Sequence, residues 1–198
     1  GWYKTGEKTY YMNNSIPVKG AKTINGKEYY FDPQTGVMRT GWVYRLGFKF
    51  YYNKKTGVLV KDVDSIIGKQ ERYKIKVNCQ KNVVTVYAKD GNNGYIIPVK
   101  SFICSTGKAS TPTVKGTFYT PNKWRWQILM GPSWGQWVTQ IYQGYYFHSV
   151  FYSSENNNNT LAVGAYNRLG SGGSHGCVRL TAGDAKWIYD NCKLGTEV

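Results

Sequence analysis

The 198-residue sequence predicts a mainly β protein in two parts, a short solenoid of β-hairpins followed by a β-sandwich-like domain with one C-terminal helix. Three observations favour this fold. An aromatic repeat fills the first 60 residues, short alternating or β-branched segments follow from residue 73, and a single segment near the C-terminus has helical periodicity. Aromatic residues make up 16% of the chain, far more than a disordered segment would carry.

Residues 1–60 align as three units, each with an aromatic cluster near its middle. The clusters stand at residues 10–11, 29–31 and 50–52. In the second unit, Asn25 and Gly26 form a typical tight hairpin turn that precedes a predicted strand at 27–31. A lone hairpin is only marginally stable in water, so we expect the units to stack and bury their aromatic faces.

Residues 61–72 contain no aromatic side chain and are mostly polar, which predicts a linker to a second domain at 73–198. Alternating and β-branched residues predict a mainly antiparallel sheet in this domain. Its expected strands cover residues 73–78, 82–87, 95–104, 117–120, 137–141 and 145–151.

The one predicted helix begins near Thr181, where Thr181 and Asp184 have the spacing of a capping box. Ala185, Ile188 and Cys192 recur on one helical face, and Gly195 marks the end of the helix. We therefore expect this face to pack on the sheet.

The chain carries 26 Lys and Arg against 11 Asp and Glu, a formal charge of +15 that is spread over both parts. Such a field favours a polyanionic partner, such as nucleic acid, anionic lipid or an acidic bacterial wall polymer. No recognised nucleic-acid-binding motif accompanies the charge, so we expect no nucleic-acid partner. No apolar run approaches the roughly 20 residues of a membrane-spanning helix, so no membrane span is predicted.

The candidate chemistry concentrates where His175 precedes Cys177 in a Gly-rich segment. A neighbouring imidazole can activate a thiol, and flanking glycines let backbone N–H groups approach a reacting carbonyl oxygen. The alternatives are a structural thiol or a zinc site that adds His148 and Cys192. Those four residues lack the paired spacing of zinc ligands, so we expect no metal. Cys104 lies in an apolar segment, where a buried hydrophobic role is expected.

The N-terminal units resemble the cell-wall-binding repeats of Gram-positive surface proteins, the choline-binding and glucan-binding family, in their Gly-Trp starts, aromatic clusters and closing glycines. The resemblance covers residues 1–60 and implies attachment to a cell-wall polymer. The second unit departs from the pattern, because Lys22 stands where the others have Trp2 and Trp42. A choline cage needs aromatic faces around the quaternary ammonium, so the resemblance leaves the ligand open.

The Ser-His-Gly-Cys sequence at 174–177 resembles the signature of YkuD-type L,D-transpeptidases, in which a preceding strand carries a second His. Here His148 lies in the predicted strand at 145–151. The Ser-Thr-Gly at 105–107 and the Thr-Pro-Thr-Val-Lys-Gly at 111–116 also match the family. The resemblance runs from about residue 73 to the end of the chain. An Asn-rich insertion makes the stretch between His148 and the signature longer than usual.

Carried over residue by residue, the resemblance makes Cys177 the nucleophile and His148 the general base. Ser149 would orient the imidazole through its backbone carbonyl, and His175 would shape the pocket. Backbone N–H groups around Gly176 and Cys177 would form the oxyanion hole.

Four further residues are expected to bind substrate: Arg179, Ser174, Tyr146 and Trp134. If the segment is extended, Arg179 shares a face with Cys177 and could hold a stem-peptide carboxylate. A solvated surface charge is the alternative for Arg179. Trp134 belongs to a tryptophan-rich segment that could be a lid over the cleft or aromatic core.

The resemblance implies a peptidoglycan L,D-transpeptidase that forms 3-3 cross-links by cysteine acyl transfer, from a donor tetrapeptide to the side-chain amine of an acceptor stem. No cofactor is expected, because a thiol, a base and an oxyanion hole suffice. An L,D-carboxypeptidase and a catalytically silent wall-binding protein remain as alternatives. We expect a monomer, extracellular and wall-associated in a Gram-positive bacterium. Because residue 1 is Gly, we also expect a longer precursor.

Overall fold

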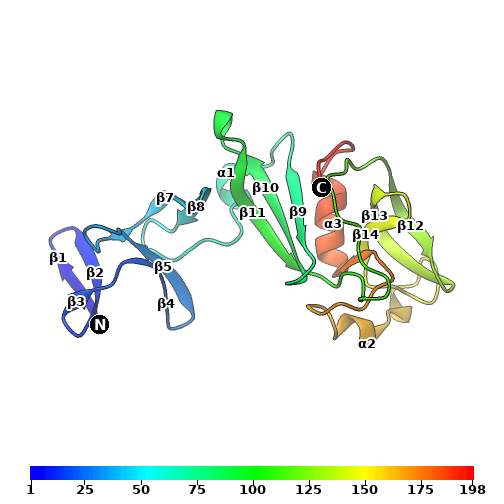
Figure 1. Ribbon diagram of the computed structural model, residues 1–198, viewed down its shortest axis with the longest axis horizontal. Helices are drawn as coiled ribbons and strands as arrows, with labels where there is room; N and C mark the ends of the chain where they lie inside the picture. The colour runs from blue at the N-terminus through cyan, green and yellow to red at the C-terminus, as the bar shows by residue number, and fades with distance from the viewer.

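The computed structural model describes residues 1–198 and places three β-hairpin units in succession at one end of the molecule (Figure 1). Each unit forms its own small antiparallel sheet, as the repeats predict. The strands are β1 (Trp2–Thr5), β2 (Lys8–Asn13), β3 (Ile16–Pro17), β4 (Gly20–Ile24), β5 (Lys27–Phe31), β6 (Met38–Arg39), β7 (Gly41–Arg45) and β8 (Phe48–Tyr52).

The predicted turn between β4 and β5 is confirmed. Asn25 and Gly26 have φ angles of +49° and +73°, which is the left-handed conformation that a two-residue hairpin turn requires. The aromatic clusters provide the core of the repeats: Phe31 and Tyr52 are fully buried, and Trp2 packs edge-on against a ring of the second unit. The hairpins therefore stabilise one another through aromatic stacking between units.

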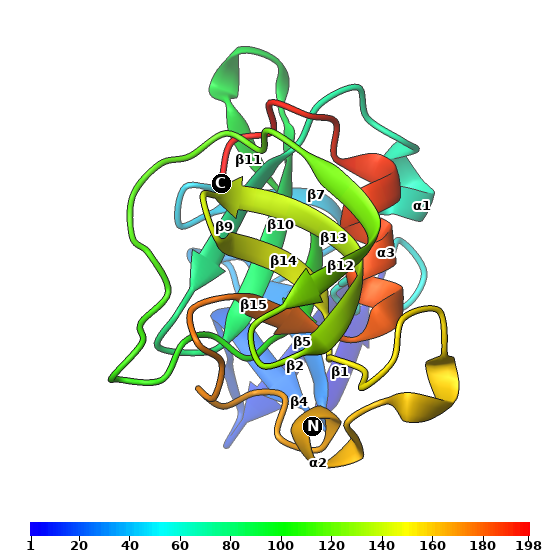
Figure 2. The ribbon, with the colours of Figure 1, turned by 90° about the vertical axis from the view of Figure 1, so that its right-hand side faces the viewer.

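The remainder of the chain contains two sheets that face each other, with a helix beside them (Figure 2). The first sheet has the order β11-β10-β9, and the second has the order β12-β13-β14-β15. All strand pairs are antiparallel except β14 with β15, which is parallel. The strands are β9 (Lys74–Asn78), β10 (Val83–Lys89), β11 (Tyr95–Ile103), β12 (Lys123–Leu129), β13 (Ser133–Tyr142), β14 (Tyr145–Ser149) and β15 (Val178–Leu180).

The core of this domain lies between the two sheets and under the helix α3 (Ala182–Asn191). Thr181 Oγ1 accepts the backbone N–H of Asp184 at 3.1 Å, so the predicted helix start is confirmed. The predicted apolar face is confirmed as well, since Ala185, Ile188 and Cys192 are fully buried. The short elements α1 (Asp64–Ile67), η1 (Gly91–Asn93), η2 (Asn158–Thr160) and α2 (Val163–Tyr166) lie in connections.

The strands expected from the sequence differ from the structure at segment 117–120, at β12 and at β15, since no strand was expected at Val178–Leu180. The segment 117–120 is not a strand: Tyr119 makes one isolated bridge to Glu197, because the backbone there joins the C-terminal end of the chain rather than a sheet. Strand β12 was not predicted, although Trp124, Trp126 and Ile128 alternate along it. The tryptophans of this segment were interpreted as a lid or as aromatic core, and their period of two was not used to predict a strand.

The segment 61–72 contacts the C-terminal domain. Val63 is 1% exposed within that domain's core, and its N–H donates to the Val99 carbonyl at 3.2 Å. The third repeat unit also contacts the domain, since Phe48 stacks on Tyr87 with 5.6 Å between ring centroids. The repeats are thus held against the first sheet by side-chain packing as well as by the connecting chain.

We expect Ile75→Ala to lower the free energy of unfolding by about 2–5 kcal/mol, because the side chain is fully buried between the sheets. Urea denaturation would measure the change. Ile103→Ala is the matched control in the same sheet, since Ile103 is 60% exposed and its truncation should cost about 0.5 kcal/mol or less. Equal losses in the two variants would contradict the assigned core.

Candidate active site

The parallel pairing of β14 with β15 brings the predicted catalytic residues to one face. Phe147 pairs with Val178 and His148 pairs with Arg179. Side chains alternate along a strand, so Phe147 and Val178 enter the core while His148 and Arg179 face the opposite side. Cys177 immediately precedes β15 and reaches the same side.

These side chains line a cavity of about 260 Å³. Six of the predicted site residues contribute to its wall: Cys177, His148, His175, Arg179, Ser174 and Tyr146. The remaining wall comes from the turn between β12 and β13 and from nearby segments: Ile128, Leu129, Met130, Ser133, Gly144 and Phe151. The cavity therefore combines a thiol, two imidazoles and a guanidinium with an apolar lip.

The His148 imidazole is buried and held in one tautomer. Its Nδ1 lies 2.5 Å from the Ser149 carbonyl oxygen, the contact that the family resemblance implies. A carbonyl can only accept, so Nδ1 carries the proton and Nε2 has a free lone pair. Burial lowers the pKa of His148 to about 4, the Ser149 contact opposes the shift, and the positive charge of Arg179 adds to it. His148 is therefore a neutral base at physiological pH.

Strand β13 supports this imidazole from behind. A Cβ atom on Gly135 would lie 3.0 Å from His148 Nδ1 and 3.1 Å from its Cβ, closer than ordinary packing allows. Glycine at this position lets the ring lie directly against the strand. The next N–H, that of Gln136, donates to Ser149 Oγ at 3.0 Å and fixes the residue whose carbonyl orients the ring.

The Cys177 thiol lies in a partly desolvated environment. Its Sγ is 3.5 Å from the Gly144 carbonyl oxygen, to which it can donate. Burial raises the pKa of Cys177, whereas a hydrogen bond from the Tyr146 backbone and the charge of Arg179 oppose the increase. The resting site thus pairs a neutral thiol with a neutral imidazole rather than a preformed thiolate with an imidazolium.

The loop before Cys177 is braced internally. Ser174 Oγ donates to the Cys177 carbonyl at 2.5 Å and accepts the Gly176 N–H at 3.0 Å. Ser174 is fully buried, so its hydroxyl shapes the loop rather than being free for substrate, and the Gly176 N–H is already engaged. Gly176 has a φ of +118°, and a Cβ there would lie 2.7 Å from the Tyr145 ring, so only glycine fits.

Two threonines that the sequence analysis did not assign to the site form hydrogen bonds to the same loop. Thr113 Oγ1 donates to the Gly176 carbonyl at 2.8 Å and accepts the Gly107 N–H at 2.9 Å. Thr111 Oγ1 donates to the Ser174 carbonyl at 3.1 Å. Both belong to the Thr-Pro-Thr segment that marks the family resemblance, so the motif was visible but its bracing role was not.

Arg179 has an incompletely satisfied guanidinium. Its Nη1 donates to the Gly173 carbonyl at 3.2 Å, and its Cζ lies 4.9 Å from the centroid of the Phe151 ring. Its Nε is buried and has no hydrogen-bond partner. An unpaired buried donor beside a cavity is well suited to a carboxylate ligand.

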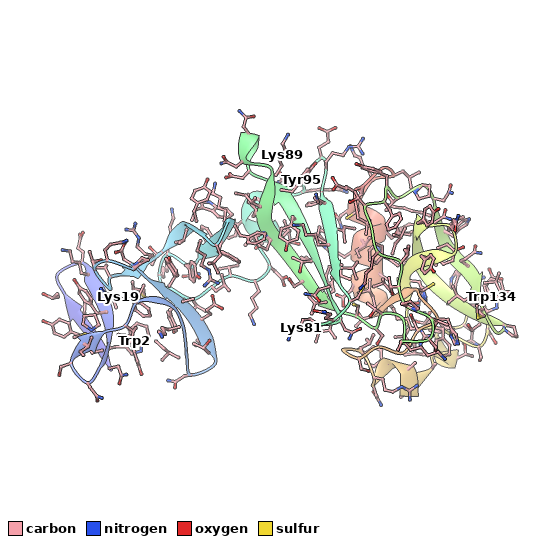
Figure 3. All side chains as sticks on the ribbon, in the orientation of Figure 1. Trp2, Lys19, Lys81, Lys89, Tyr95 and Trp134 are labelled. Atoms are coloured by element: carbon pink, nitrogen blue, oxygen red, sulfur yellow. The ribbon has the colours of Figure 1, made fainter.

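The other two candidate side chains, His175 and Trp134, differ in their position relative to the cavity. His175 is exposed at the rim of the cavity. Trp134 does not line the cavity: its backbone pairs with Ile128 and Tyr152, near the end of the molecule farthest from the repeats (Figure 3). Trp134 therefore lies outside this cavity, whose lip includes Met130 of the turn that follows β12.

The Asn-rich insertion has fixed ends. Tyr152 pairs with both Trp134 and Leu161, so the insertion is closed by a β-bridge at its base. Asn158 Oδ1 accepts a hydrogen bond from Gln136 Nε2 at 3.2 Å. The insertion is thus attached to the strand that supports His148.

No cluster of three or more His, Cys, Asp or Glu side chains is arranged to hold a metal ion. None of the helices has the length and apolar character needed to cross a membrane.

Comparison with known families agrees with this arrangement. Residues 72–198 match the L,D-transpeptidase catalytic domain, YkuD, and residues 18–62 match the choline-binding repeat. The first match covers more than half of the sequence, so the chain belongs to the YkuD family of L,D-transpeptidase catalytic domains.

Individual relatives extend the comparison. YciB of Bacillus subtilis strain 168, which is named as an L,D-transpeptidase, is 35% identical over 135 residues, which are 66% of this chain and 66% of the relative. An L,D-transpeptidase from Mycobacterium smegmatis has a TM-score of 0.51 at 21% identity, with 64% of this chain and 57% of that chain covered. LD transpeptidase LdtMt1 in complex with imipenem has a TM-score of 0.50 at 21% identity, with 63% and 56% covered. The two structural likenesses concern the fold alone.

Lowering the pH should destabilise the protein through His148. Its pKa falls from 6.5 to about 4 on folding, so between these values the unfolded chain binds a proton that the folded chain does not. The free energy of unfolding should therefore be retained above pH 6.5 and fall as the pH is lowered, by on the order of 2 kcal/mol at pH 4.5. Urea denaturation across this range would measure the loss.

The control for this effect is a pair of histidine variants. His148→Gln should lack the corresponding part of the pH dependence, whereas His175→Gln should retain it, because His175 is exposed. Identical pH profiles for the wild type and His148→Gln would contradict a buried neutral imidazole.

Proposed function

We propose that this protein is a peptidoglycan L,D-transpeptidase that forms 3-3 cross-links by cysteine acyl transfer. The observation that carries the proposal is one cavity that holds the Cys177 thiol, the neutral His148 imidazole and the unpaired Nε of Arg179. This set provides a nucleophile, a base and an anion-binding group. Membership in the YkuD family supports the choice of stem peptides as substrates.

In the first half-reaction, Cys177 Sγ attacks the carbonyl carbon that joins the third stem residue to D-Ala. The S–H proton passes to His148 Nε2 as the C–S bond forms. The C–N bond then breaks, and D-Ala leaves with the proton from the imidazolium. A thioester between Cys177 and the donor stem remains.

In the second half-reaction, the side-chain amine of an acceptor stem attacks the thioester carbon. The amine transfers a proton to His148 Nε2 as the new C–N bond forms. The C–S bond breaks, and the departing sulfur recovers the proton from the imidazolium. The amide product joins the third residues of two stems, and the resting thiol and imidazole are restored.

The pKa directions support proton transfer during attack. Burial favours the neutral forms of both Cys177 and His148, so an ion pair is not the resting state. The thiol gains nucleophilicity only as a bound substrate brings the carbonyl into position. This arrangement would limit reaction of the free enzyme with other electrophiles.

Arg179 is proposed to hold a carboxylate of the donor stem. Its buried Nε lacks a partner, and the cavity wall includes no Asp or Glu that would compete for it. With the Gly176 N–H engaged by Ser174, the Cys177 N–H is the backbone donor that we assign to the developing oxyanion.

The N-terminal repeats are proposed to keep the enzyme at the wall outside the cell of a Gram-positive bacterium, as a monomer. The match of residues 18–62 to the choline-binding repeat supports wall attachment. The formal charge of +15 supports an additional attraction to acidic wall polymers.

Incubation with a disaccharide tetrapeptide should yield a cross-linked dimer, detected by liquid chromatography and mass spectrometry. The acceptor amine is the expected partner of the thioester. Cys177→Ala should give neither dimer nor released D-Ala. Release of tripeptide without dimer would replace the transpeptidase proposal with an L,D-carboxypeptidase, in which water is the acceptor.

Imipenem should acylate Cys177, giving one adduct in the intact-protein mass. LdtMt1, a fold relative, is known in complex with this compound. Cys177→Ala should abolish the adduct and His148→Ala should slow its formation by at least about a hundredfold, since general-base catalysis contributes that much. Cys79→Ser, Cys104→Ser and Cys192→Ser are the controls and should retain it. An adduct on another cysteine would overturn the nucleophile assignment.

A further inference from the structure

Two cations of the third repeat unit lie within cation–π range of its own aromatic rings, of which Trp42 and Tyr44 remain 37% and 58% exposed. Lys49 Nζ lies 5.1 Å from the centroids of both the Trp42 and Tyr44 rings. The Arg45 guanidinium lies 4.5 Å from the centroid of Phe50. All three distances are within the roughly 6 Å range of cation–π attraction. The rings that a quaternary ammonium would use in this unit therefore already have ammonium and guanidinium partners.

Lys49 is fixed at the rings by an acidic residue of the catalytic domain. Asp90 lies in the turn between β10 and β11, and its Oδ1 is 2.7 Å from Lys49 Nζ. Its Oδ2 accepts hydrogen bonds from the Tyr44 hydroxyl at 2.7 Å and from Asn93 Nδ2 at 3.0 Å. These hydrogen bonds, led by the one from Lys49, lower the pKa of Asp90 to about 2, so its carboxylate remains charged.

The contact is partly shielded from solvent and lies beside aromatic rings. The side chains of Lys49 and Asp90 are only 18% and 14% exposed. Beside them, Phe48 stacks on Tyr87 of the catalytic domain, and Lys76 Nζ lies 5.9 Å and 5.3 Å from the two ring centroids. A charge-assisted pair next to stacked rings is stronger than an exposed surface pair.

The third unit is also tied to the second unit. Arg45 Nη2 lies 2.5 Å from Glu28 Oε1, so the other cation of the hairpin is paired as well. On the open side, Trp42 and Tyr44 border a hollow of about 730 Å³. Arg39 and Asp32 line this hollow too, and Arg39 Nε lies 3.6 Å from Asp32 Oδ2, so these two charges offset each other and the cation nearest the Trp42 and Tyr44 rings is Lys49.

We propose that the third repeat is an internal docking unit, with Lys49 as the resident cation of its Trp42 and Tyr44 rings. Choline and other quaternary ammonium ligands are excluded from these rings while Lys49 is paired with Asp90. The unit instead holds the repeat array against the catalytic domain. This role differs from ligand binding, although residues 18–62 match a choline-binding repeat.

Choline chloride titration of the 198-residue chain tests the exclusion, with tryptophan fluorescence as the readout and sodium chloride at matched ionic strength as the reference. In the wild type, choline should cause no fluorescence change that is lost when Trp42 is replaced by Phe. Lys49→Met should gain a saturable response, and the double variant Lys49→Met, Trp42→Phe should lose it. Lys55→Met, which removes an exposed lysine of the same unit, should behave as the wild type.

Limited trypsin digestion tests the docking. The connecting segment 61–72 contains Lys61, Lys69 and Arg72 as cleavage sites. Loss of a charge-assisted contact should increase the rate of cleavage in this segment by about tenfold in Lys49→Met and in Asp90→Asn. Lys55→Met should be cleaved at the wild-type rate.

Each remaining outcome decides against the proposal. A wild-type choline response that Trp42→Phe abolishes would show that Lys49 does not exclude the ligand. The absence of any response in Lys49→Met would show that the rings are not a cation site. Unchanged trypsin cleavage in both docking variants would remove the docking role. None of these readouts involves turnover, so they are separate from the test of transpeptidase activity.

Discussion

The site depends on the parallel pairing of two short strands. Because Phe147 lies opposite Val178 and His148 lies opposite Arg179, a single register places His148, Arg179 and the neighbouring Cys177 on one side of the sheet. The same register sends the alternate side chains into the core. A shift by one residue would bury the functional side chains and expose the apolar ones, so core packing enforces the geometry of the site.

Around this pairing, the protein supports the reacting groups mainly with backbone contacts. The Ser149 carbonyl orients the imidazole, β13 lies directly behind it at Gly135, and Thr113 and Ser174 hold the loop that leads to Cys177. Backbone atoms in sheets have little freedom to rearrange, which makes them suitable for preorganisation. Burial favours the neutral forms of the thiol and the imidazole.

The sequence predicted the larger features because they rest on repetition and alternation. The hairpin at Asn25 and Gly26, the strands of the first sheet and the face of the C-terminal helix follow from local patterns. Strand β15 was too short for its periodicity to be recognised. The bracing of Gly176 by Ser174 and Thr113 depends on contacts between distant segments, which one sequence does not encode locally.

The roles of individual polar residues were hardest to assign for the same reason. Ser174 and Trp134 were both expected at the substrate, Ser174 as part of the signature at 174–177 and Trp134 as part of the tryptophan-rich segment before the predicted His148 strand. The structure turns the Ser174 hydroxyl toward its own loop and keeps Trp134 off the cavity wall. Proximity along the chain identified the region, whereas hydrogen-bond partners and strand direction decide what each side chain contacts.

A β-bridge closes the base of the Asn-rich insertion, so a change in the length of the insertion need not move Cys177 or His148. Tyr152 pairs with Trp134 and Leu161, so residues between these fixed points can be added or removed while β14 keeps its place. Doubling such a loop costs only about 0.6 kcal/mol in closure entropy. The insertion is therefore a region in which descendants of this chain could acquire new surface, for a different wall polymer or a regulatory partner, without rebuilding the cysteine and histidine site.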